Sequence, residues 1–465
     1  MQYFKPAGNF FVGDCMPYFH DGLFHLYYLL DENHHQSLNG LGGHQWAHAS
    51  TTDLVHWTQH PLALPISDEQ EGSICTGSVY FHRGKHCAFY ATRGLNRHQR
   101  LSLAVSDDAI HFVKINPDLF FPPQPDYSPL HFRDPCPFLD PETGIYHLLI
   151  SAQLASYPLS GRGGCLAHLT SPDLDRWTMQ EPFLIPGYAD VPECSDFFFW
   201  NGWYYLIFST SLTAHYRMSR RPLGPWIQPP VDTLDGPLAR VMKTAPFTGG
   251  RRIGAAWLGT RAGDKDDGKP QWGGHLLFRE LIQHIDGTLG CKIPSEMVPP
   301  CGESIPLTLT ATTVTAVGDT APSAAQGERI RLDGRSGLSV VQIVGVPHNA
   351  HIAIRLTPTG RSGDFGLRLR STGDYEHAYA LAITPAAGTV TLGNQTIYGV
   401  AGLDQPLQVV IVLKDDISDV CISITDIGTY RCIVNRCPEL HGNHLYLFAH
   451  NVAVTVDEIE IRPLL

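Results

Sequence analysis

The sequence predicts an all-β protein: a five-bladed β-propeller over residues 1–290, a connector over 291–304 and a β-sandwich over 305–465. Short segments rich in β-branched and aromatic residues are bounded by Gly, Asp, Asn and Pro, as strands are. In the first part these segments recur with a period of roughly 50 residues. After Trp272 tryptophan disappears and alternating Ile, Val, Leu and Thr take over. About four strands per unit, repeated around an axis, make a propeller.

Length, charge and cysteine usage narrow the class of protein. A chain of 465 residues is too long for one core, so two domains are expected. The net charge of −12 argues against nucleic acid and anionic membranes as partners. Eleven scattered cysteines without a C-x-x-C pair indicate reduced thiols. We see no signal peptide and no membrane-spanning run, and therefore expect a cytoplasmic protein.

Two signatures define the repeat. The first is a glycine turn followed by an aromatic strand, at Asp21-Gly22, Arg83-Gly84, Thr143-Gly144, Asn201-Gly202 and Gly249-Gly250. The second is a strand, a polar turn and a closing aromatic residue, which is Trp57, Phe112, Trp177 or Trp226. Five copies of the first signature predict five blades, and the closing aromatic residues are expected to pack between blades.

The remaining chain has a different pattern. Pro and Gly interrupt residues 291–304, which reads as a connector. Alternating apolar strands at 338–344, 409–413 and 452–461 then indicate a β-sandwich. No acidic pair there has a context like that of the first domain, so a structural role is expected.

Three acids stand at matching places in the repeat. Asp14, Asp134 and Glu193 each precede a strand pair with the first signature, which places them on one rim of a closed β-array. Acidic residues often only cap turns. Three in equivalent positions instead favour a common pocket, and two carboxylates are the minimum equipment for cleaving a glycosidic bond.

The neighbours of the acids suggest different roles. Glu193 precedes Cys194 and an aromatic block at 197–200, and desolvation by that block would raise the pKa of Glu193, as a general acid requires. Asp14 follows Gly13 in a turn whose polar setting would keep it ionised. Asp134 follows Arg133, and an arginine-paired carboxylate stays charged and can support positive charge in a transition state.

These residues carry a resemblance to glycoside hydrolase family 32, the β-fructosidases, over most of residues 9–285. Phe132–Pro135 matches the family's Arg-Asp-Pro motif and Pro192–Asp196 its Glu-Cys motif. Weaker matches are His44–Ala49 with Asp53–Trp57, Cys75–Val79, and Gln271–Gly274 with Phe278–Leu281.

The resemblance implies a five-bladed catalytic propeller with a C-terminal β-sandwich. It implies an exo-acting, retaining β-fructofuranosidase-like enzyme acting on a small carbohydrate, with Asp14 as nucleophile, Glu193 as acid/base and Asp134 as transition-state stabiliser. The substrate-binding residues expected beside them are Arg133, His44, Trp46, Ser78, Cys194 and Trp272. Trp46 and Trp272 suit either sugar stacking or core packing.

Departures from the family pattern leave alternatives open. The family's Asn-Asp-Pro-Asn-Gly is Gly13-Asp14-Cys15-Met16-Pro17 here, and its Asp-Phe-Tyr-Ala stretch appears as residues 241–245. An inverting arabinofuranosidase- or xylosidase-type propeller, or a non-catalytic carbohydrate-binding protein, therefore remains as an alternative. The pair His34-His35 lacks metal-ligand spacing, so we expect neither a catalytic metal nor a cofactor. The sugar, its linkage and the oligomeric state are left open.

Overall fold

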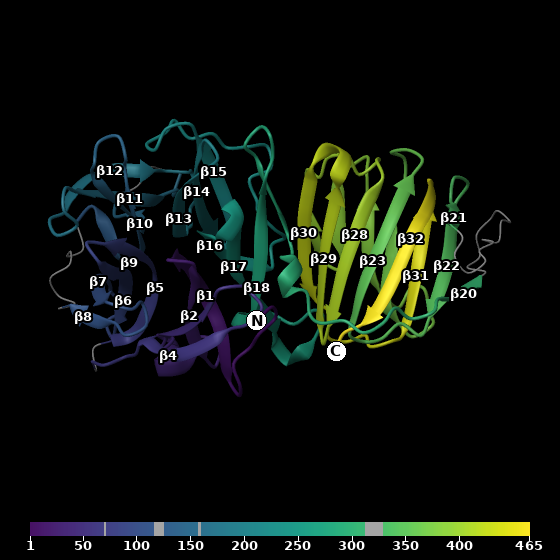
Figure 1. Cartoon of the computed structure of the whole chain (residues 1–465), viewed down its shortest axis with the longest axis horizontal. Coiled ribbons are helices and arrows are strands. Elements are labelled where there is room, and N and C mark those ends of the chain that lie inside the picture. The colour runs from purple at the N-terminus through teal and green to yellow at the C-terminus, as the bar shows by residue number, and fades with distance from the viewer. Residues whose placement is uncertain (69–70, 116–124, 157–159, 312–328) are drawn as a thin grey trace. The chain divides into compact units, whose positions relative to one another are not determined.

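The structure is a computed structural model that describes residues 1–68, 71–115, 125–156, 160–311 and 329–465. Strands dominate both of its compact units (Figure 1). The first unit is Met1–Thr233, Ala239–Thr260 and Gln271–Leu281, and the second is Leu234–Leu238, Arg261–Pro270 and Ile282–Leu465. Within the range predicted for the propeller, residues 234–238, 261–270 and 282–290 thus belong to the second unit.

The first unit is the predicted five-bladed propeller. Blade I contains β1 (Phe10–His20), β2 (Leu23–Glu32), β3 (Gln45–Thr51) and β4 (Thr58–Leu64). Blade II contains β5 (Glu71–His82), β6 (Lys85–Gly94), β7 (Gln99–Ser106) and β8 (Val113–Ile115). Blade III contains β9 (Tyr127–Leu139), β10 (Tyr146–Leu154), β11 (Gly164–Ser171) and β12 (Thr178–Leu184). Blade IV contains β13 (Glu193–Trp200), β14 (Trp203–Thr210) and β15 (Thr213–Ser219), and blade V β16 (Ala239–Pro246), β17 (Arg252–Arg261) and β18 (Pro270–Gln283).

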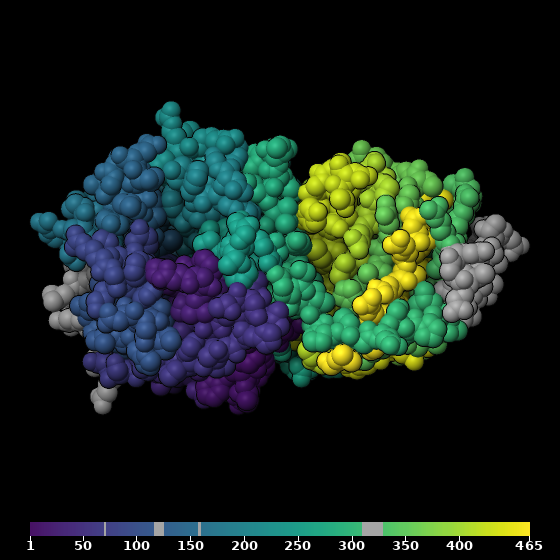
Figure 2. Space-filling model, viewed as in Figure 1, coloured from purple at the N-terminus to yellow at the C-terminus, as the bar shows by residue number. Residues whose placement is uncertain are grey.

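The first strand of each blade faces the propeller axis. These strands contact one another in a closed ring, β1 to β5, β5 to β9, β9 to β13, β13 to β16, and β16 back to β1. Within each blade the neighbouring strands are antiparallel. On the face shown in Figure 2, atoms from the purple, blue and teal parts of the chain surround a hollow in this unit.

The polar turn of the second signature is held by its own side chains. Oδ1 of Asp53 accepts hydrogen bonds from the backbone N–H groups of Val55 and His56, at 2.9 and 2.8 Å. The same arrangement recurs at Asp108 and Asp173. An Asp that bonds to the backbone two and three residues ahead fixes a turn, which explains why the motif recurs in three blades.

The closing aromatic residues pack between blades, as predicted. Trp57 of blade I lies 5.4 Å from Phe278 of blade V, centroid to centroid. The same relationship joins Phe112 to Tyr27, Trp177 to Phe89 and Trp226 to Phe183. Each aromatic ring therefore packs against the blade before its own. The second signature thus marks the contacts between neighbouring blades.

The ring is closed by the N-terminal segment. Backbone hydrogen bonds join Tyr3 and Phe4 to Leu276 of β18, at 2.9 and 2.8 Å, and Val12 of β1 pairs with Gly274. A Cβ on Gly274 would lie 1.8 Å from the carbonyl oxygen of Leu258, so only glycine fits there. Closure in this way leaves blade V without an exposed edge on that side.

The second unit is the predicted β-sandwich. Its seven-stranded sheet contains β20 (Thr308–Ala311), β22 (Leu338–Val344), β31 (His444–His450), β24 (Asp364–Ser371), β25 (Tyr379–Thr384), β26 (Thr389–Leu392) and β27 (Gln395–Ile397). Its six-stranded sheet contains β21 (Ile330–Asp333), β32 (Ala453–Pro463), β23 (Ala350–Pro358), β28 (Leu407–Lys414), β29 (Ile417–Ile424) and β30 (Thr429–Arg436). Alternate residues of both sheets, such as Ile352 and Leu367, fill one apolar core.

The other elements are short. They are α1 (Ser37–Gly40), β19 (Leu289–Lys292) and 3-10 turns at Thr248–Gly250, Ala262–Asp264, Ser295–Met297 and Thr425–Ile427. In the described ranges no helix has the length and apolar character needed to cross a bilayer. All eleven cysteines are free thiols, as their spacing predicts.

Candidate active site

The first strand of every blade has a bulge at the same level of the propeller. The pairing register shifts between Val12 and Cys15, Ile74 and Gly77, Arg133 and Cys136, Glu193 and Asp196, and Arg240 and Lys243. A bulge adds a residue to one strand and re-aims its side chains. Asp14, Asp134 and Glu193 sit at these bulges. The repeat predicted acids that precede the strand pairs. The structure places them within the first strands, where the bulges turn them toward the axis.

Asp14 is held by three donors from three blades. Its Oδ1 accepts a hydrogen bond from Trp257 Nε1 at 2.9 Å, and its Oδ2 accepts one from Thr76 Oγ1 at 2.7 Å. The thiol of Cys194 lies 3.6 Å from Oδ2. Burial raises the pKa of Asp14, and the bonds from Thr76 and Trp257 oppose that rise. The surroundings of Asp14 are polar, as predicted, but burial affects its pKa more than the hydrogen-bond donors do.

Arg133 links the other two acids. Its Nη2 donates to Glu193 Oε2 at 3.0 Å, and its Nε lies 3.4 Å from Asp134 Oδ2. The same Asp134 oxygen accepts a hydrogen bond from the backbone N–H of Cys194 at 3.1 Å. Asp134 is fully buried, and the cation beside it compensates its charge.

Glu193 has the raised pKa that a general acid needs. Burial is the largest cause and raises the pKa to about 7, although Arg133 lowers it. The aromatic block does not supply this desolvation: Phe197, Phe198 and Phe199 line a different cavity, toward the other end of β13. The predicted cause is therefore wrong, since alternation and the bulge separate these rings from Glu193.

One pocket of about 350 Å³ gathers the three acids. Arg133, His44 and Trp272 line it with them. Trp272 stacks on His44 with ring centroids 4.6 Å apart. Its indole also covers Gly13, where a Cβ would lie 2.3 Å from the ring. The glycine before Asp14 is therefore required by the close approach of Trp272.

Three other residues expected to bind substrate lie elsewhere. Trp46 is fully buried among Tyr27 and Tyr90, and its Nε1 donates to the carbonyl oxygen of Cys75, so it is a core residue. Ser78 lines the second cavity, not the acidic pocket. Cys194 is buried behind Asp14 and Asp134 and contacts the acids themselves. The prediction that Trp46 and Ser78 contact substrate in this pocket is therefore wrong.

Lys243 fills the axis between the two cavities. Its Nζ donates to the carbonyl oxygens of Gly77 and Ser195 and to Oγ of Ser78, each at 2.9 Å. The second cavity, about 540 Å³, is lined by residues later in the same inner strands, such as Phe19. The buried ammonium thus has three oxygen partners and joins blades II, IV and V.

A histidine cluster of Asp31, His35 and His44, whose two histidines line the pocket, was not anticipated. Asp31 Oδ1 lies 3.0 Å from His44 Nε2, which lies 3.0 Å from His35 Nδ1. Burial raises the pKa of Asp31 to about 7, and burial lowers those of His35 and His44 to about 4 and 3. These three groups lie close enough together to hold a metal ion. The spacing of 31, 35 and 44 matches no familiar ligand motif, so sequence alone gave no signal.

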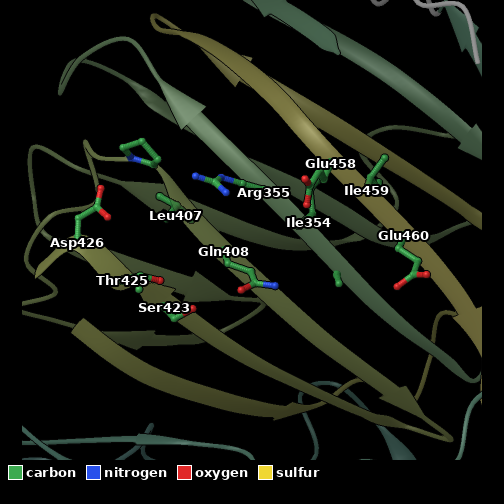
Figure 3. Close-up of a pocket in the computed structure, with 12 residues that line it drawn as sticks. Ile354, Arg355, Leu407, Gln408, Ser423, Thr425, Asp426, Glu458, Ile459 and Glu460 are labelled. Atoms are coloured by element: carbon green, nitrogen blue, oxygen red, sulfur yellow. The ribbon is translucent and has the colours of Figure 1, made fainter. Parts of the chain in front are cut away.

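The sandwich has a cavity of its own, shown in Figure 3. Arg355, Gln408 and Glu458 project from the neighbouring strands β23, β28 and β32. Asp426 and Glu460 also line it, and none of its described lining residues is aromatic. Glu460 is partly exposed and pairs with Arg462 at 2.7 Å. This open, polar face lacks the enclosed acids of the propeller pocket.

The sequence of the propeller matches a known protein family. Residues 4–221 match the profile described as "Glycosyl hydrolases family 32 N-terminal domain". This part of the chain is a family 32 domain. The resemblance on the Arg-Asp-Pro and Glu-Cys motifs is thereby confirmed.

Characterised relatives of the family 32 domain share part of its sequence. Sucrose-6-phosphate hydrolase of Escherichia coli is 28% identical over 218 residues, which is 44% of this chain and 42% of that protein. Fructan 1-exohydrolase w2 of Triticum aestivum is 27% identical over 207 residues, which is 42% of this chain and 33% of that protein. The match thus spans less than half of either relative.

Solved structures share the fold over the whole chain. Fructan 1-exohydrolase IIa from Cichorium intybus aligns with a TM-score of 0.75 at 16% identity, covering 99% of this chain and 96% of its own. Exo-inulinase from Aspergillus awamori aligns with a TM-score of 0.70 at 15% identity, covering 100% and 98%. The family 32 domain followed by a β-sandwich is therefore an architecture already known.

Proposed function

We propose that this protein is an exo-acting, retaining β-fructofuranosidase-like glycosidase that cleaves terminal furanosides. The observation that carries the proposal is the single pocket in which Asp14, Asp134 and Glu193 meet beside Arg133. The names of the family 32 relatives support a fructosyl substrate cleaved from the chain end.

The contacts of the acids fit a division of labour. Glu193, with a pKa near 7, holds a proton at the start of the reaction and gives it to the leaving oxygen. Asp14, fixed by Trp257 and Thr76, attacks the anomeric carbon. Asp134, beside Arg133 and a backbone N–H, supports the oxocarbenium-like transition state.

The two steps balance in protons and bonds. In the first, an oxygen of Asp14 bonds to the anomeric carbon while the glycosidic bond breaks and the leaving oxygen takes the proton of Glu193. In the second, Glu193 takes a proton from water, and the water oxygen replaces Asp14 on the anomeric carbon. Both carboxyl groups then return to their initial states.

The altered first motif does not remove this machinery. Cys15 is fully buried with its thiol 3.6 Å from the carbonyl oxygen of Ala256, and Met16 packs in the core with Tyr27. Neither side chain lines the acidic pocket. The departure from Asn-Asp-Pro-Asn-Gly therefore changes the packing behind Asp14 and removes neighbouring amides that could contact a sugar.

The test is hydrolysis of sucrose, short fructans and aryl arabinofuranosides, with the first-formed anomer followed by NMR. Release of terminal fructose with retained configuration is expected. Inverted product or preference for arabinofuranosides would replace the proposal with the arabinofuranosidase-type alternative. Binding of these sugars without turnover of any of them would favour the non-catalytic alternative.

A further inference from the structure

A buried ammonium group lies behind the acidic pocket. Lys243 is 4% exposed and lies at the bulge of β16. Its three N–H groups are all used: they donate to the carbonyl oxygens of Gly77 and Ser195 and to Oγ of Ser78, each at 2.9 Å. All three acceptors are neutral oxygens of other blades, so these contacts tie blades II and IV to blade V.

The acceptors of this ammonium adjoin the groups that hold Asp14. Gly77 follows Thr76, whose hydroxyl donates to Oδ2 of Asp14 at 2.7 Å. Ser195 follows Cys194, whose thiol lies 3.6 Å from the same oxygen. Ser195 also lies inside the register shift of β13, where the ladder is interrupted and its carbonyl oxygen needs another donor. The ammonium thus secures, from behind, the two backbone segments that contact the proposed nucleophile.

Gly77 is held through both of its backbone polar groups. Its carbonyl oxygen accepts a hydrogen bond from Lys243, and its N–H donates to the thioether sulfur of Met16 at 3.3 Å. Met16 and Lys243 belong to the two stretches that depart from the family pattern, residues 13–17 and 241–245. The two departures therefore meet at one residue of blade II and form a single support behind the acids.

The arginines that line the acidic pocket are engaged with other groups. Arg133 pairs with the other two acids. Arg93 donates to Nε2 of His35 at 3.1 Å, which places the proton of the neutral ring on Nδ1. In the described ranges no cation forms an ion pair with Asp14; its side-chain contacts are neutral donors. The placement of those donors therefore decides how well its negative charge is stabilised.

Lys243 also adds a positive charge to a ring of acidic groups. The titratable groups that interact with Asp14 include Asp134 on β9, Glu193 and the thiol of Cys194 on β13, and the thiols of Cys15 on β1 and Cys75 on β5. Each of these is neutral or negative. Lys243 lowers the pKa of the Cys194 thiol, so its charge reaches a direct neighbour of Asp14. A positive charge there favours the ionised carboxylate.

We propose that Lys243 is a positioning residue for Asp14. By fixing the backbone after Thr76 and after Cys194, its ammonium keeps both side chains in contact with the carboxylate. The inference rests on the proposed function, in which Asp14 is the nucleophile. Lys243 does not line the acidic pocket, so its removal should change kcat and the pKa of Asp14 and leave KM unchanged.

The test variant is Lys243→Met, which removes the charge and all three hydrogen bonds but keeps most of the side-chain volume. A small residue would instead leave a void behind the acidic pocket. Loss of the support should raise the pKa of Asp14 by about one unit. Because Asp14 attacks in its ionised form, the acidic limb of the kcat/KM profile should move to higher pH, and kcat should fall about tenfold.

Lys114→Met is the matched control. Nζ of Lys114 also has oxygen partners in the propeller, the carbonyl oxygen of Pro65 and Oε2 of Glu71, both at 2.7 Å, but it does not line the acidic pocket. This variant should lose stability in chemical denaturation and keep the pH profile of the wild type. Lower stability of both variants, with an unmoved pKa of Asp14 in Lys243→Met, would overturn the positioning role.

A double-mutant cycle tests the route of the effect. Thr76→Val removes the hydroxyl that donates to Asp14, so Lys243→Met should move the pKa of Asp14 less in that background. A shift of undiminished size would overturn the proposal. If Lys243→Met does not fold, Met16→Leu removes the sulfur acceptor of Gly77 at nearly constant volume. The pKa of Asp14 should then rise, and an unmoved value would overturn the proposal.

The pKa of Asp14 is measurable without turnover. Carbon-13 NMR of protein labelled at its aspartate carboxyl groups follows the titration, and Asp14→Asn assigns the resonance. A raised pKa in Lys243→Met, in a protein that hydrolyses no furanoside, would refute the proposed function alone. An unchanged pKa and kcat in Lys243→Met, beside release of fructose by the wild type, would refute the positioning role alone.

Discussion

The indole N–H of Trp257 donates to Oδ1 of Asp14 at 2.9 Å, joining β17 to β1 across 243 positions of sequence. This bond points at the carboxylate that the proposed mechanism uses as nucleophile. Because a hydrogen bond to the charged form lowers the pKa of an acid, it opposes the rise that burial causes at Asp14.

Trp257→Phe should therefore raise the pKa of Asp14. Asp14 must be ionised to attack, so the acidic limb of the kcat/KM profile should move to higher pH and kcat should fall, by roughly tenfold or more for one charge-assisted hydrogen bond. The measurement is a pH–rate profile. Trp200→Phe, which removes a bond to the carbonyl oxygen of Gly250 and touches neither Asp14 nor the acidic pocket lining, is the control. An unmoved acidic limb would show that Trp257 does not act through Asp14.

Replacement of Glu193 should depend on the leaving group. Only poor leaving groups need the proton, so Glu193→Gln should lose about 10²–10⁴-fold on sucrose and retain measurable activity on an activated aryl glycoside. Since the working form is protonated and its pKa is about 7, wild-type kcat/KM should decline as the pH rises through that value. The same loss on both substrates would contradict an acid role.

Asp14→Asn should abolish turnover on every substrate, because no covalent intermediate can form. Azide should rescue Asp14→Gly with inverted configuration and Glu193→Ala with retained configuration, a contrast that NMR of the glycosyl azides can read. Asp53→Asn alters a surface turn and provides a carboxylate control. If Asp14→Asn and Glu193→Gln show the same leaving-group dependence, the assigned roles are wrong.

Replacing the two tryptophans expected near the sugar should have different effects, on stability for Trp46 and on substrate binding for Trp272. Trp46→Ala empties a fully buried site and should lower the free energy of unfolding by about 3–5 kcal/mol. Trp272→Ala removes a pocket wall and should raise KM well beyond its effect on stability. Chemical denaturation and steady-state kinetics on both variants provide the comparison. A KM change for Trp272→Ala that merely follows its loss of folded protein would count against a role in binding.

Exhaustive chelation should leave activity unchanged. The Asp31, His35 and His44 cluster has the proximity of a metal site, but the N–H of Arg93 directed at His35 Nε2 places a proton where an ion would need a lone pair. Activity lost on chelation and restored by one added ion would refute this, and would redefine the cluster.

The sequence predicted those parts of the site that lie at equivalent positions of the repeat. Asp14, Asp134 and Glu193 occupy equivalent strands, so periodicity places them together before any coordinates exist. Trp257 and Arg93 have no such signal, because their relation to the acids depends on how distant blades meet. The repeat also predicted the five blades, for the same reason.

Other predictions failed where local irregularity overrides pattern. Ser78 was predicted to bind substrate, but at the register shift between Ile74 and Gly77 it is Thr76 that lines the acidic pocket and donates to Asp14. The aromatic run after Glu193 suggested desolvation by adjacency, yet the strand carries Phe197 away to the second cavity. A bulge cannot be read from alternation, since it is the place where alternation breaks.

The pairing of Val12 with Gly274 has a consequence for synthesis. During translation Asp14 emerges early, but β18, which pairs with the nearby Val12, is synthesised more than half a chain later. Domains generally fold as units while the ribosome is still extending the chain. A nascent polypeptide that stops before blade V therefore carries all three acids and still has no closed ring to hold them. Ribosome-stalled chains truncated before and after residue 281 would show activity only in the longer one.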